Sequence, residues 1–123
     1  MPEFILSRIS AIMKDHNIKD IKRVGLYGLT YKENVDDTRE SPTLQILEKL
    51  SENLAFGIKT FDPFINHIMV EGQELDFQKF LSEIDILVVL VAHNHIKENI
   101  DKIKGKIIFD TRNVINIDGV YKL

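Results

Sequence analysis

The sequence has 123 residues, and its length and 44% hydrophobic content suit one hydrophobic core of ordinary size. Charged residues make up 28% of the chain and the formal net charge is −3, so the overall charge does not favour nucleic-acid binding. The absence of cysteine excludes disulfides, thiolate metal sites and cysteine nucleophiles, and it fits a reducing compartment, so we expect a cytoplasmic location.

The chain begins with a helical pattern. Pro2 suits a first helical turn, and apolar residues then recur at helical spacing: Ile5, Ile9, Ile12 and Met13. A short β-type run follows over residues 22–27. We therefore expect a leading helix within residues 1–20 and an α/β core over residues 21–123, which together form one domain, residues 1–123.

A second helix is predicted after a long polar loop. Ser41 and Pro42 form a strong helix start, because Ser is a favoured N-cap and Pro is tolerated at the first helical position. One apolar stripe follows at helical spacing: Leu44, Leu47, Leu50 and Leu54.

A second strand then precedes two further helical pieces. The strand is predicted over residues 58–61 and stops at an Asp-Pro pair. Residues 64–73 are expected to contain a short helix and a loop. Another short amphipathic helix is predicted by three apolar positions: Phe77, Phe80 and Leu81.

The most apolar stretch predicts the centre of a sheet. Residues 86–91 are aliphatic on both faces, as in a parallel strand covered by helices on each side. This run is far shorter than the ~20 residues of a membrane-spanning helix, and we expect no membrane contact. Residues 106–109 predict another strand, and residues 114–117 an edge strand. The alternation predicts an α/β fold, a three-layer α/β/α Rossmann-like domain with a mostly parallel sheet.

Ligands of such sheets bind beyond the carboxyl ends of the strands, and the first loop there carries cations. Lys32 and Arg39 precede the helix start at Ser41, and both cations and free N–H groups suit phosphate or carboxylate. The alternative is that the charged residues of this loop pair with one another in solvent. Gly25 and Gly28 do not form the G-x-G-x-x-G fingerprint, and tight packing and a turn explain them equally well.

Three other polar residues follow predicted strands. Asp62 could bind a ribose, but the missing fingerprint and the following Pro63 favour a turn-forming role. His93 and His95 could bind a metal or act as a general base, yet a third ligand of obvious spacing is missing. We therefore expect loop histidines and no metal site.

Two strings in the first loop resemble the hallmark of a known family. Residues 28–32 read Gly-Leu-Thr-Tyr-Lys and residues 36–42 read Asp-Asp-Thr-Arg-Glu-Ser-Pro, which is similar to the signature of the UDP-glucose/GDP-mannose dehydrogenase family. Residues 1–3 resemble the start of that family's second domain, and residues 61–63 and 109–113 resemble two of its turns. The resemblance covers essentially the whole chain.

The resemblance implies a division of labour between two domains. In that family an N-terminal domain binds NAD and supplies a catalytic cysteine, and a C-terminal domain closes over the nucleotide sugar. This chain resembles only the second. Tyr31, Lys32 and Arg112 would contact the UDP-sugar, and Arg39 would reach the NAD held by the other domain. No catalytic residue is expected in this chain, so alone it should be inactive.

The resemblance also implies a substrate class. Residues 91–95, Val-Ala-His-Asn-His, resemble the N-acetylhexosamine branch, although Ile96 departs from it. This favours an NAD-dependent UDP-N-acetylmannosamine or UDP-N-acetylglucosamine 6-dehydrogenase, with UDP-glucose 6-dehydrogenase next, in polysaccharide precursor synthesis. Its partners would be the UDP-sugar, its own N-terminal domain and, in the full-length enzyme, a second copy. The alternatives are a free-standing regulatory or mononucleotide-binding module without catalysis, and a pure interaction domain.

Overall fold

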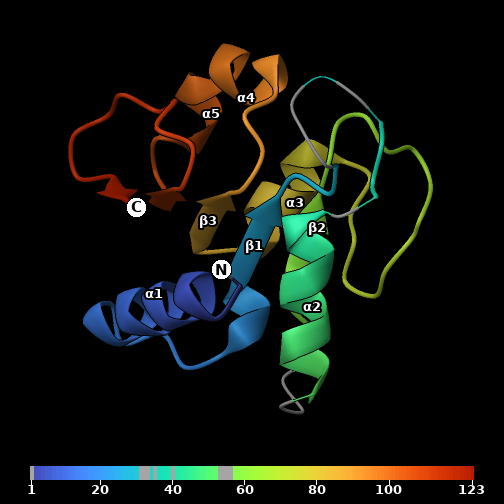
Figure 1. Ribbon diagram of the computed structural model, residues 1–123. Coiled ribbons are helices and arrows are strands. Elements are labelled where there is room, and N and C mark those ends of the chain that lie inside the picture. Colours follow the sequence, from blue (N-terminus) through green and yellow to red (C-terminus); the bar gives the residue numbers. More distant parts are fainter. Residues whose placement is uncertain (1, 31–33, 35, 40, 53–56) are drawn as a thin grey trace.

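A parallel β-sheet of five strands organises the chain, of which the computed structural model describes residues 2–30, 34, 36–39, 41–52 and 57–123 (Figure 1). The strands are β1 Val24–Tyr27, β2 Lys59–Phe61, β3 Ile86–Val89, β4 Ile107–Asp110 and β5 Tyr121–Lys122. They lie in the order β2-β1-β3-β4-β5, and every neighbouring pair is parallel. The aliphatic strand β3 is therefore central, as predicted.

Strands β1 to β4 end level with one another. The register pairs Tyr27 of β1 with Phe61 of β2 and with Val89 of β3, and it pairs Val89 with Asp110 of β4. Because the strands are parallel, the loops that follow them leave the sheet on one side, which we call the carboxyl edge.

Two helices cover one face of the sheet, namely α1 Pro2–Asp15 and α2 Pro42–Glu52. On α2, Ile46 is fully buried whereas Leu44 and Leu47 are half-buried. Leu47 of the predicted leucine stripe packs against the buried cluster of this face, whereas the Leu50 side chain and Leu54 lie outside the described residues. The other buried side chains of this face come from α1, the strands and their connections: Ile5, Ile9, Ile12, Val24, Leu26, Ile58, Ile86, Val88, Leu90 and Phe109.

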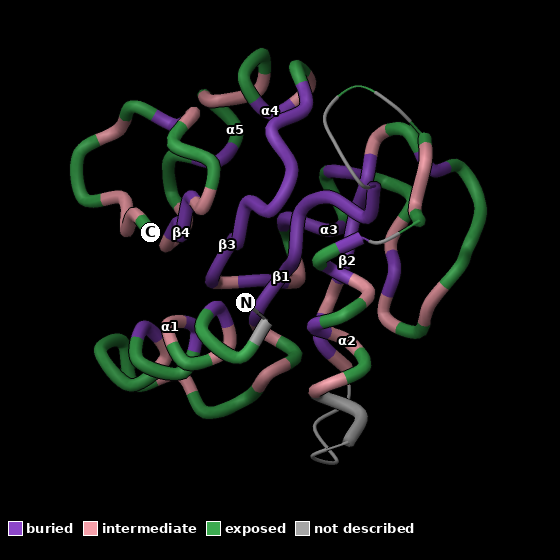
Figure 2. The backbone as a smooth tube through the Cα atoms, in the orientation of Figure 1, coloured by how far each residue is buried: buried purple, intermediate pink, exposed green. Residues whose placement is uncertain are grey.

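Three helices pack on the opposite face, namely α3 Phe77–Glu83, α4 Asn94–Glu98 and α5 Ile100–Ile103. Their apolar side chains join Tyr27, Leu87 and Ile108 in a second buried cluster. Figure 2 shows that β1 and β3, between the two helical layers, are buried along their length. This arrangement confirms the predicted three-layer α/β/α fold.

Two glycines allow close contacts in this fold. A Cβ on Gly25 would lie 2.6 Å from Cζ of Phe80 and 2.7 Å from Cδ1 of Ile84, both on the α3 side of the sheet. Gly28 has a φ of +108°, which an L side chain rarely adopts, and its Cβ would meet Val91. The two glycines thus serve packing and a turn, one of the two interpretations that the sequence left open.

The segment after β2 does not contain the predicted short helix. Residues 64–73 form turns and bends. The Gln73 side chain holds them, since its Oε1 accepts the N–H of Met69 at 2.6 Å and its Nε2 donates to the carbonyl of His67 at 2.8 Å. These bonds occupy backbone groups that a helical turn would have used, so the helix prediction was wrong here.

The edge strand also differs from the prediction, since it is β5 and not residues 114–117. The backbone N–H groups of Val114 and Ile115 both donate to Oδ2 of Asp110, each at 2.7 Å. Because these donors are occupied, this stretch cannot extend the sheet, and β5 pairs with β4 instead. All four strand pairs are parallel, in agreement with the predicted mostly parallel sheet.

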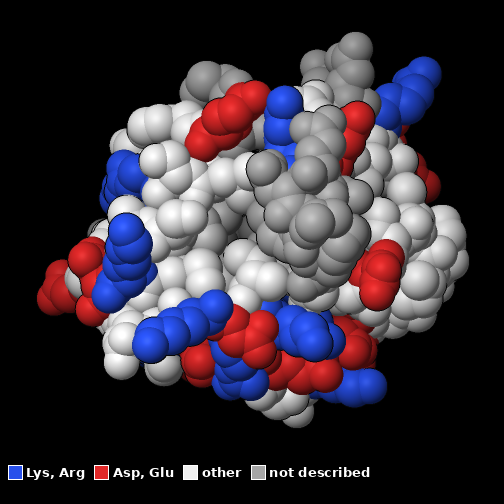
Figure 3. Space-filling model, turned by 90° about the horizontal axis from the view of Figure 1, so that it is seen from below, with Lys and Arg blue, Asp and Glu red and all other residues white. Residues whose placement is uncertain are grey.

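The length of the helices and the surface charge indicate how the chain could meet a membrane or a nucleic acid. None of the helices in the described ranges combines the length and the apolar character needed to cross a bilayer. On the face seen in Figure 3, acidic and basic side chains of the described residues are interspersed, without a broad patch of one sign. The described residues of this face therefore show no continuous basic stripe of the kind that binds a nucleic-acid backbone.

Replacing Gly25 by Ala should destabilise the fold, because the new methyl group would have to displace the Phe80 ring. Overpacking of a filled core typically costs about 1–3 kcal/mol, which chemical denaturation would detect as a lower free energy of unfolding. Gly105→Ala is the matched control, since no atom lies within 4 Å of a Cβ at that position. Equal free energies of unfolding for the two variants would contradict the packing role of Gly25.

Candidate functional site

The buried carboxylate of Asp62 lies at the carboxyl edge, directly after β2, and is 1% exposed. Its Oδ2 accepts the N–H groups of Leu29 at 2.7 Å and Thr30 at 3.2 Å, and its Oδ1 accepts the N–H of Phe64 at 2.8 Å. Asp62 thus forms the predicted turn, and it also holds the start of the loop after β1. A carboxylate enclosed in this way cannot offer its oxygens to a ribose, so the alternative role of Asp62 is wrong.

The imidazole of His93 completes the surroundings of this carboxylate and is itself fully buried. Its Nε2 lies 2.9 Å from Oδ2 of Asp62 and 3.2 Å from Oγ1 of Thr30. On the other side of the ring, the backbone N–H of Asn34 donates to Nδ1 at 2.8 Å. Nδ1 must therefore carry a lone pair, so the ring is the neutral tautomer that donates from Nε2 to Asp62. We call Thr30, Asn34, Asp62 and His93 the carboxyl-edge cluster.

Two opposing influences set the protonation of Asp62. Burial is the largest single influence and raises the pKa of Asp62, but the hydrogen bonds from His93, Leu29 and Phe64 outweigh it together. The pKa of Asp62 is therefore lower than its ordinary value. The carboxylate is ionised at neutral pH, and its charge is met by donors from three segments of the chain.

His95 lies two residues further along the chain, within α4 and among aromatic rings. Its Nδ1 is 2.9 Å from the hydroxyl of Tyr27, and its ring lies 4.7 Å from that of Phe77, centroid to centroid. Burial, the main cause, lowers the pKa of His95. The prediction of loop histidines holds for His93, which lies in the connection before α4 although it is buried, and it was wrong for His95, which lies within that helix. Among the described residues, no three side chains of the His, Cys, Asp or Glu type come together to hold a metal ion.

A second buried carboxylate shapes the turn after β4. Asp110 is 1% exposed, and its Oδ1 accepts the N–H of Arg112 at 3.0 Å. Its Oδ2 accepts Nζ of Lys122 at 2.7 Å, in addition to the two N–H groups that prevent an edge strand. Burial again raises the pKa most, but these hydrogen bonds, led by that of Lys122, bring the pKa of Asp110 below its ordinary value.

This turn presents Arg112 to solvent beside a pocket. Arg112 is exposed, and within the described part of the chain its guanidinium forms neither an ion pair nor a hydrogen bond. The pocket measures about 380 Å³ and is lined by Asp110, Thr111, Arg112, Asn113, Lys122 and Leu123. A cation held by a fixed turn at a pocket can bind an anionic group.

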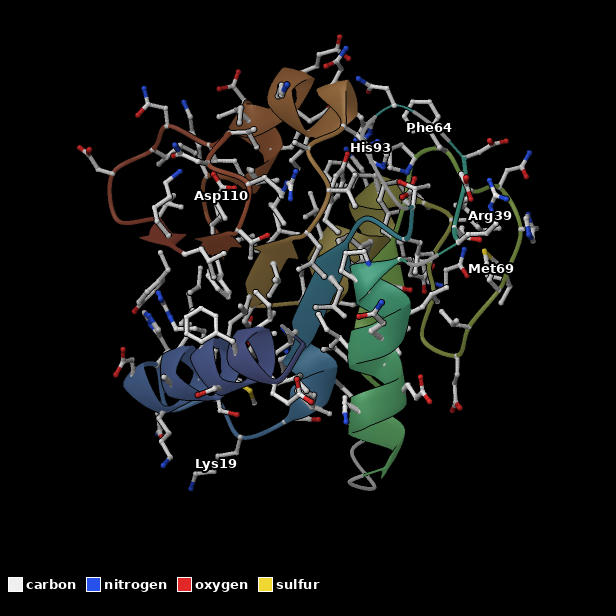
Figure 4. All side chains as sticks on the ribbon, in the orientation of Figure 1. Lys19, Arg39, Phe64, Met69, His93 and Asp110 are labelled. Atoms are coloured by element: carbon white, nitrogen blue, oxygen red, sulfur yellow. The ribbon has the colours of Figure 1, made fainter. Side chains whose placement is uncertain are left out.

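The other predicted site residues lie elsewhere. Tyr31 and Lys32 fall outside the described residues. Arg39 has an 87% exposed side chain and makes a two-point contact with Asp37, with Nη2 2.8 Å from Oδ2 and Nε 3.0 Å from Oδ1. This pair matches the alternative that the loop's charges pair with one another. Figure 4 shows Arg39 well apart from Asp110 and hence from the Arg112 turn, with His93 between them in this view.

The carboxyl-edge cluster was not predicted from the sequence. Its members come from four positions that only the sheet brings together, and their hydrogen bonds span 31 to 63 residues of chain. One signal was present, since Asp62 and His93 each follow a predicted strand of one parallel sheet. Such residues meet at the carboxyl edge if their strands are close in the sheet.

Comparison with known proteins gives one family. Residues 25–117 match the model of the UDP-glucose/GDP-mannose dehydrogenase family, UDP binding domain. The chain is similar to the UDP-N-acetyl-D-mannosamine dehydrogenase of Methanocaldococcus jannaschii, with 39% identity over 94% of this chain and 27% of that protein. It is also similar to the NDP-N-acetyl-D-galactosaminuronic acid dehydrogenase of Ralstonia solanacearum, with 29% identity over 90% of this chain and 26% of that protein.

A solved structure agrees with these similarities. The UDP-D-ManNAc dehydrogenase of Pyrococcus horikoshii superposes with a TM-score of 0.77 and 28% identity, over 98% of this chain and 29% of that protein. This chain therefore spans less than a third of the length of the proteins that it matches.

Replacing Asp62 by Asn should destabilise the fold at neutral pH. An amide has one acceptor oxygen and one NH₂ group, so it cannot accept hydrogen bonds on both sides, and each unsatisfied buried donor costs about 1–3 kcal/mol. Urea unfolding at pH 7 would measure the loss, and the exposed Asp118→Asn is the control, which should unfold like the wild type.

The difference in free energy of unfolding between the wild type and Asp62→Asn should depend on pH. The folded pKa of Asp62 is lowered, so its contribution to stability is present above the unfolded pKa and is lost as the pH falls through the folded pKa. The wild type and Asp62→Asn should therefore converge in free energy of unfolding in acid. A difference that is constant between pH 7 and pH values below the folded pKa would contradict the ionised carboxylate.

Proposed function

The chain belongs to the UDP-glucose/GDP-mannose dehydrogenase family as its UDP binding domain, and from this premise we propose that it holds the UDP portion of a nucleotide sugar at its carboxyl edge. The observation that carries the proposal is the exposed guanidinium of Arg112 beside a pocket, on a turn fixed by the buried carboxylate of Asp110. Tyr31 and Lys32, in the loop after β1, would contact the same ligand from another strand end.

The whole protein would be an NAD-dependent UDP-sugar 6-dehydrogenase. The names of the similar proteins favour a UDP-N-acetylhexosamine, oxidised to its uronate, with UDP-glucose as the next candidate. We place the enzyme in the cytoplasm and in the synthesis of polysaccharide precursors. The short span of this chain relative to its relatives supports a separate N-terminal domain, which would carry the catalytic cysteine, and the whole protein would form a homodimer.

NAD would be held mainly by that other domain, where it would accept the hydride from the sugar. The described residues of this chain fit a secondary role, because Asp62 is saturated by hydrogen bonds and Gly28 forms a turn without a dinucleotide fingerprint. Arg39 is exposed and would reach toward NAD across the domain cleft. It would first have to exchange its contact with Asp37 for one with the cofactor.

The contribution of this chain would be binding and positioning. Contacts to the diphosphate lie far from the C6 atom that reacts, yet they fix the position of the sugar and help to exclude water as the cleft closes. The chain alone should therefore bind UDP and show no dehydrogenase activity. Measurable NAD reduction by the purified chain with a UDP-sugar would contradict this division of roles.

Titration of the chain with UDP, followed by amide NMR shifts, tests the binding site. Lys32→Ala and Arg112→Ala should each weaken UDP binding about tenfold or more, because each removes a charge-assisted contact worth about 1.5–3 kcal/mol. The control is Lys19→Ala, which removes the same charge from an exposed position at the opposite end of the molecule (Figure 4). Equal affinity of all these variants would argue against the proposed site.

A test of the proposed role of Arg39 requires the full-length enzyme, which also contains the domain that would bind NAD. Arg39→Ala should raise the Michaelis constant for NAD severalfold and change that for the UDP-sugar little, because the cation would face the cofactor. Asp37→Ala removes the competing carboxylate and should not raise the constant for NAD. Equal weakening of both substrates by Arg39→Ala would contradict the cleft-bridging role.

A further inference from the structure

The loop after β1 is attached at two places to one buried pair, Asp62 and His93. Before residues 31–33, the N–H of Thr30 donates to Oδ2 of Asp62 at 3.2 Å. After them, the N–H of Asn34 donates to Nδ1 of His93 at 2.8 Å. Asp62 and His93 are themselves joined at 2.9 Å, so both flanks of the segment are fixed to the same buried unit.

Asn34 is suited to this attachment in two ways. Its backbone is left-handed, with a φ of 60°, a conformation that asparagine tolerates better than most residues. Its side-chain Oδ1 also accepts the N–H of Asn94 at 3.0 Å. Asn34 therefore contacts two successive residues where α4 begins, the N-cap His93 through its backbone and Asn94 through its side chain.

The ring that receives Asn34 has a fixed orientation. His93 packs against the ring of Phe64 at 4.8 Å and that of Tyr27 at 6.0 Å, measured between centroids. Nε2 faces Asp62 while Nδ1 faces Asn34, so the two nitrogens perform separate tasks. Nε2 donates a hydrogen bond to the buried carboxylate, and Nδ1 accepts the backbone N–H of the loop residue Asn34.

We propose that His93 is a positioning residue for nucleotide-sugar binding: through Nδ1 it fixes Asn34, and so sets the far end of the segment that carries Tyr31 and Lys32. The inference rests on the proposed function, since the segment matters only if it contacts the nucleotide. His93 itself is fully buried and would not touch the ligand.

Two substitutions separate the two nitrogens. Asn in place of His93 can set its side-chain oxygen near the position of Nδ1 and so can accept from Asn34, but it cannot reach Asp62. Gln can donate to Asp62 from near the position of Nε2 but leaves the N–H of Asn34 without its acceptor. His93→Asn should therefore keep the UDP dissociation constant within about threefold of the wild type, and His93→Gln should raise it about tenfold or more.

The amide of Asn34 gives a measurement that needs no ligand. In the wild type and in His93→Asn it should be protected from hydrogen exchange, and in His93→Gln it should exchange like a solvent-exposed amide. Nitrogen NMR of the ring should show the tautomer protonated on Nε2. An unprotected Asn34 amide in the wild type, or a proton on Nδ1, would overturn the proposal even if both variants failed to fold.

The outcomes distinguish this inference from the proposed function. A wild-type chain that gives no shifts with UDP would count against the proposed function, and the ring tautomer and the exchange of Asn34 would still decide whether His93 holds the loop. If the wild type binds UDP and His93→Gln binds it equally well, the positioning role is wrong. Weak binding by His93→Asn with normal binding by His93→Gln would also overturn the proposal, because it would assign the effect to Asp62.

Discussion

The carboxyl edge depends on the burial of one negative charge, the carboxylate of Asp62. Removing such a group from water costs several kcal/mol unless hydrogen bonds replace its hydration. The N–H groups of Leu29, Thr30 and Phe64 and the imidazole of His93 supply those bonds. They come from the loops after three different strands, so the charge is accommodated only when all three loops take their observed positions. One ionised group thereby couples segments that are distant along the chain.

The turn after β4 uses the same physical solution. Asp110 is buried, is ionised and accepts backbone N–H groups from its own turn. Its compensating cation is Lys122, which β5 brings alongside and which also donates to the carbonyl of Ile115 at 2.6 Å. The C-terminal strand therefore stabilises the turn that presents Arg112. Two buried carboxylates thus shape the polar edge, and Arg39 and Arg112 are exposed at the surface.

This arrangement bears on the anion site that we propose at the carboxyl edge. The apolar clusters pack on the two faces of the sheet and stabilise the pairing of its strands. The buried carboxylates then bind backbone N–H groups of the loops that follow the strands. A turn that is already held by hydrogen bonds, such as that of Arg112, loses less conformational entropy on binding. The contacts proposed for the diphosphate would therefore contribute more of their free energy to affinity and to positioning of the sugar.

The sequence by itself determined the layers of this protein. A run of residues that is apolar on both faces predicted β3 as the centre of a parallel sheet. Ser41 also caps α2 as predicted, since its Oγ accepts the N–H of Leu44 at 3.4 Å. These features depend on residues a few positions apart. The residue types of the first loop indicated Lys32 and Arg39 as candidates for binding an anion, and the family resemblance added Tyr31 and Arg112.

Only the tertiary structure decided what each polar residue after a strand does. Residues 114–117 have the composition of a strand, but the N–H groups of Val114 and Ile115 are taken by Asp110. His93 has the sequence context of a loop residue, but its partners Asp62 and Asn34 lie 31 and 59 residues away. Hydrogen bonds over such separations depend on which strands are neighbours and on how they are aligned, and local sequence patterns do not contain that information.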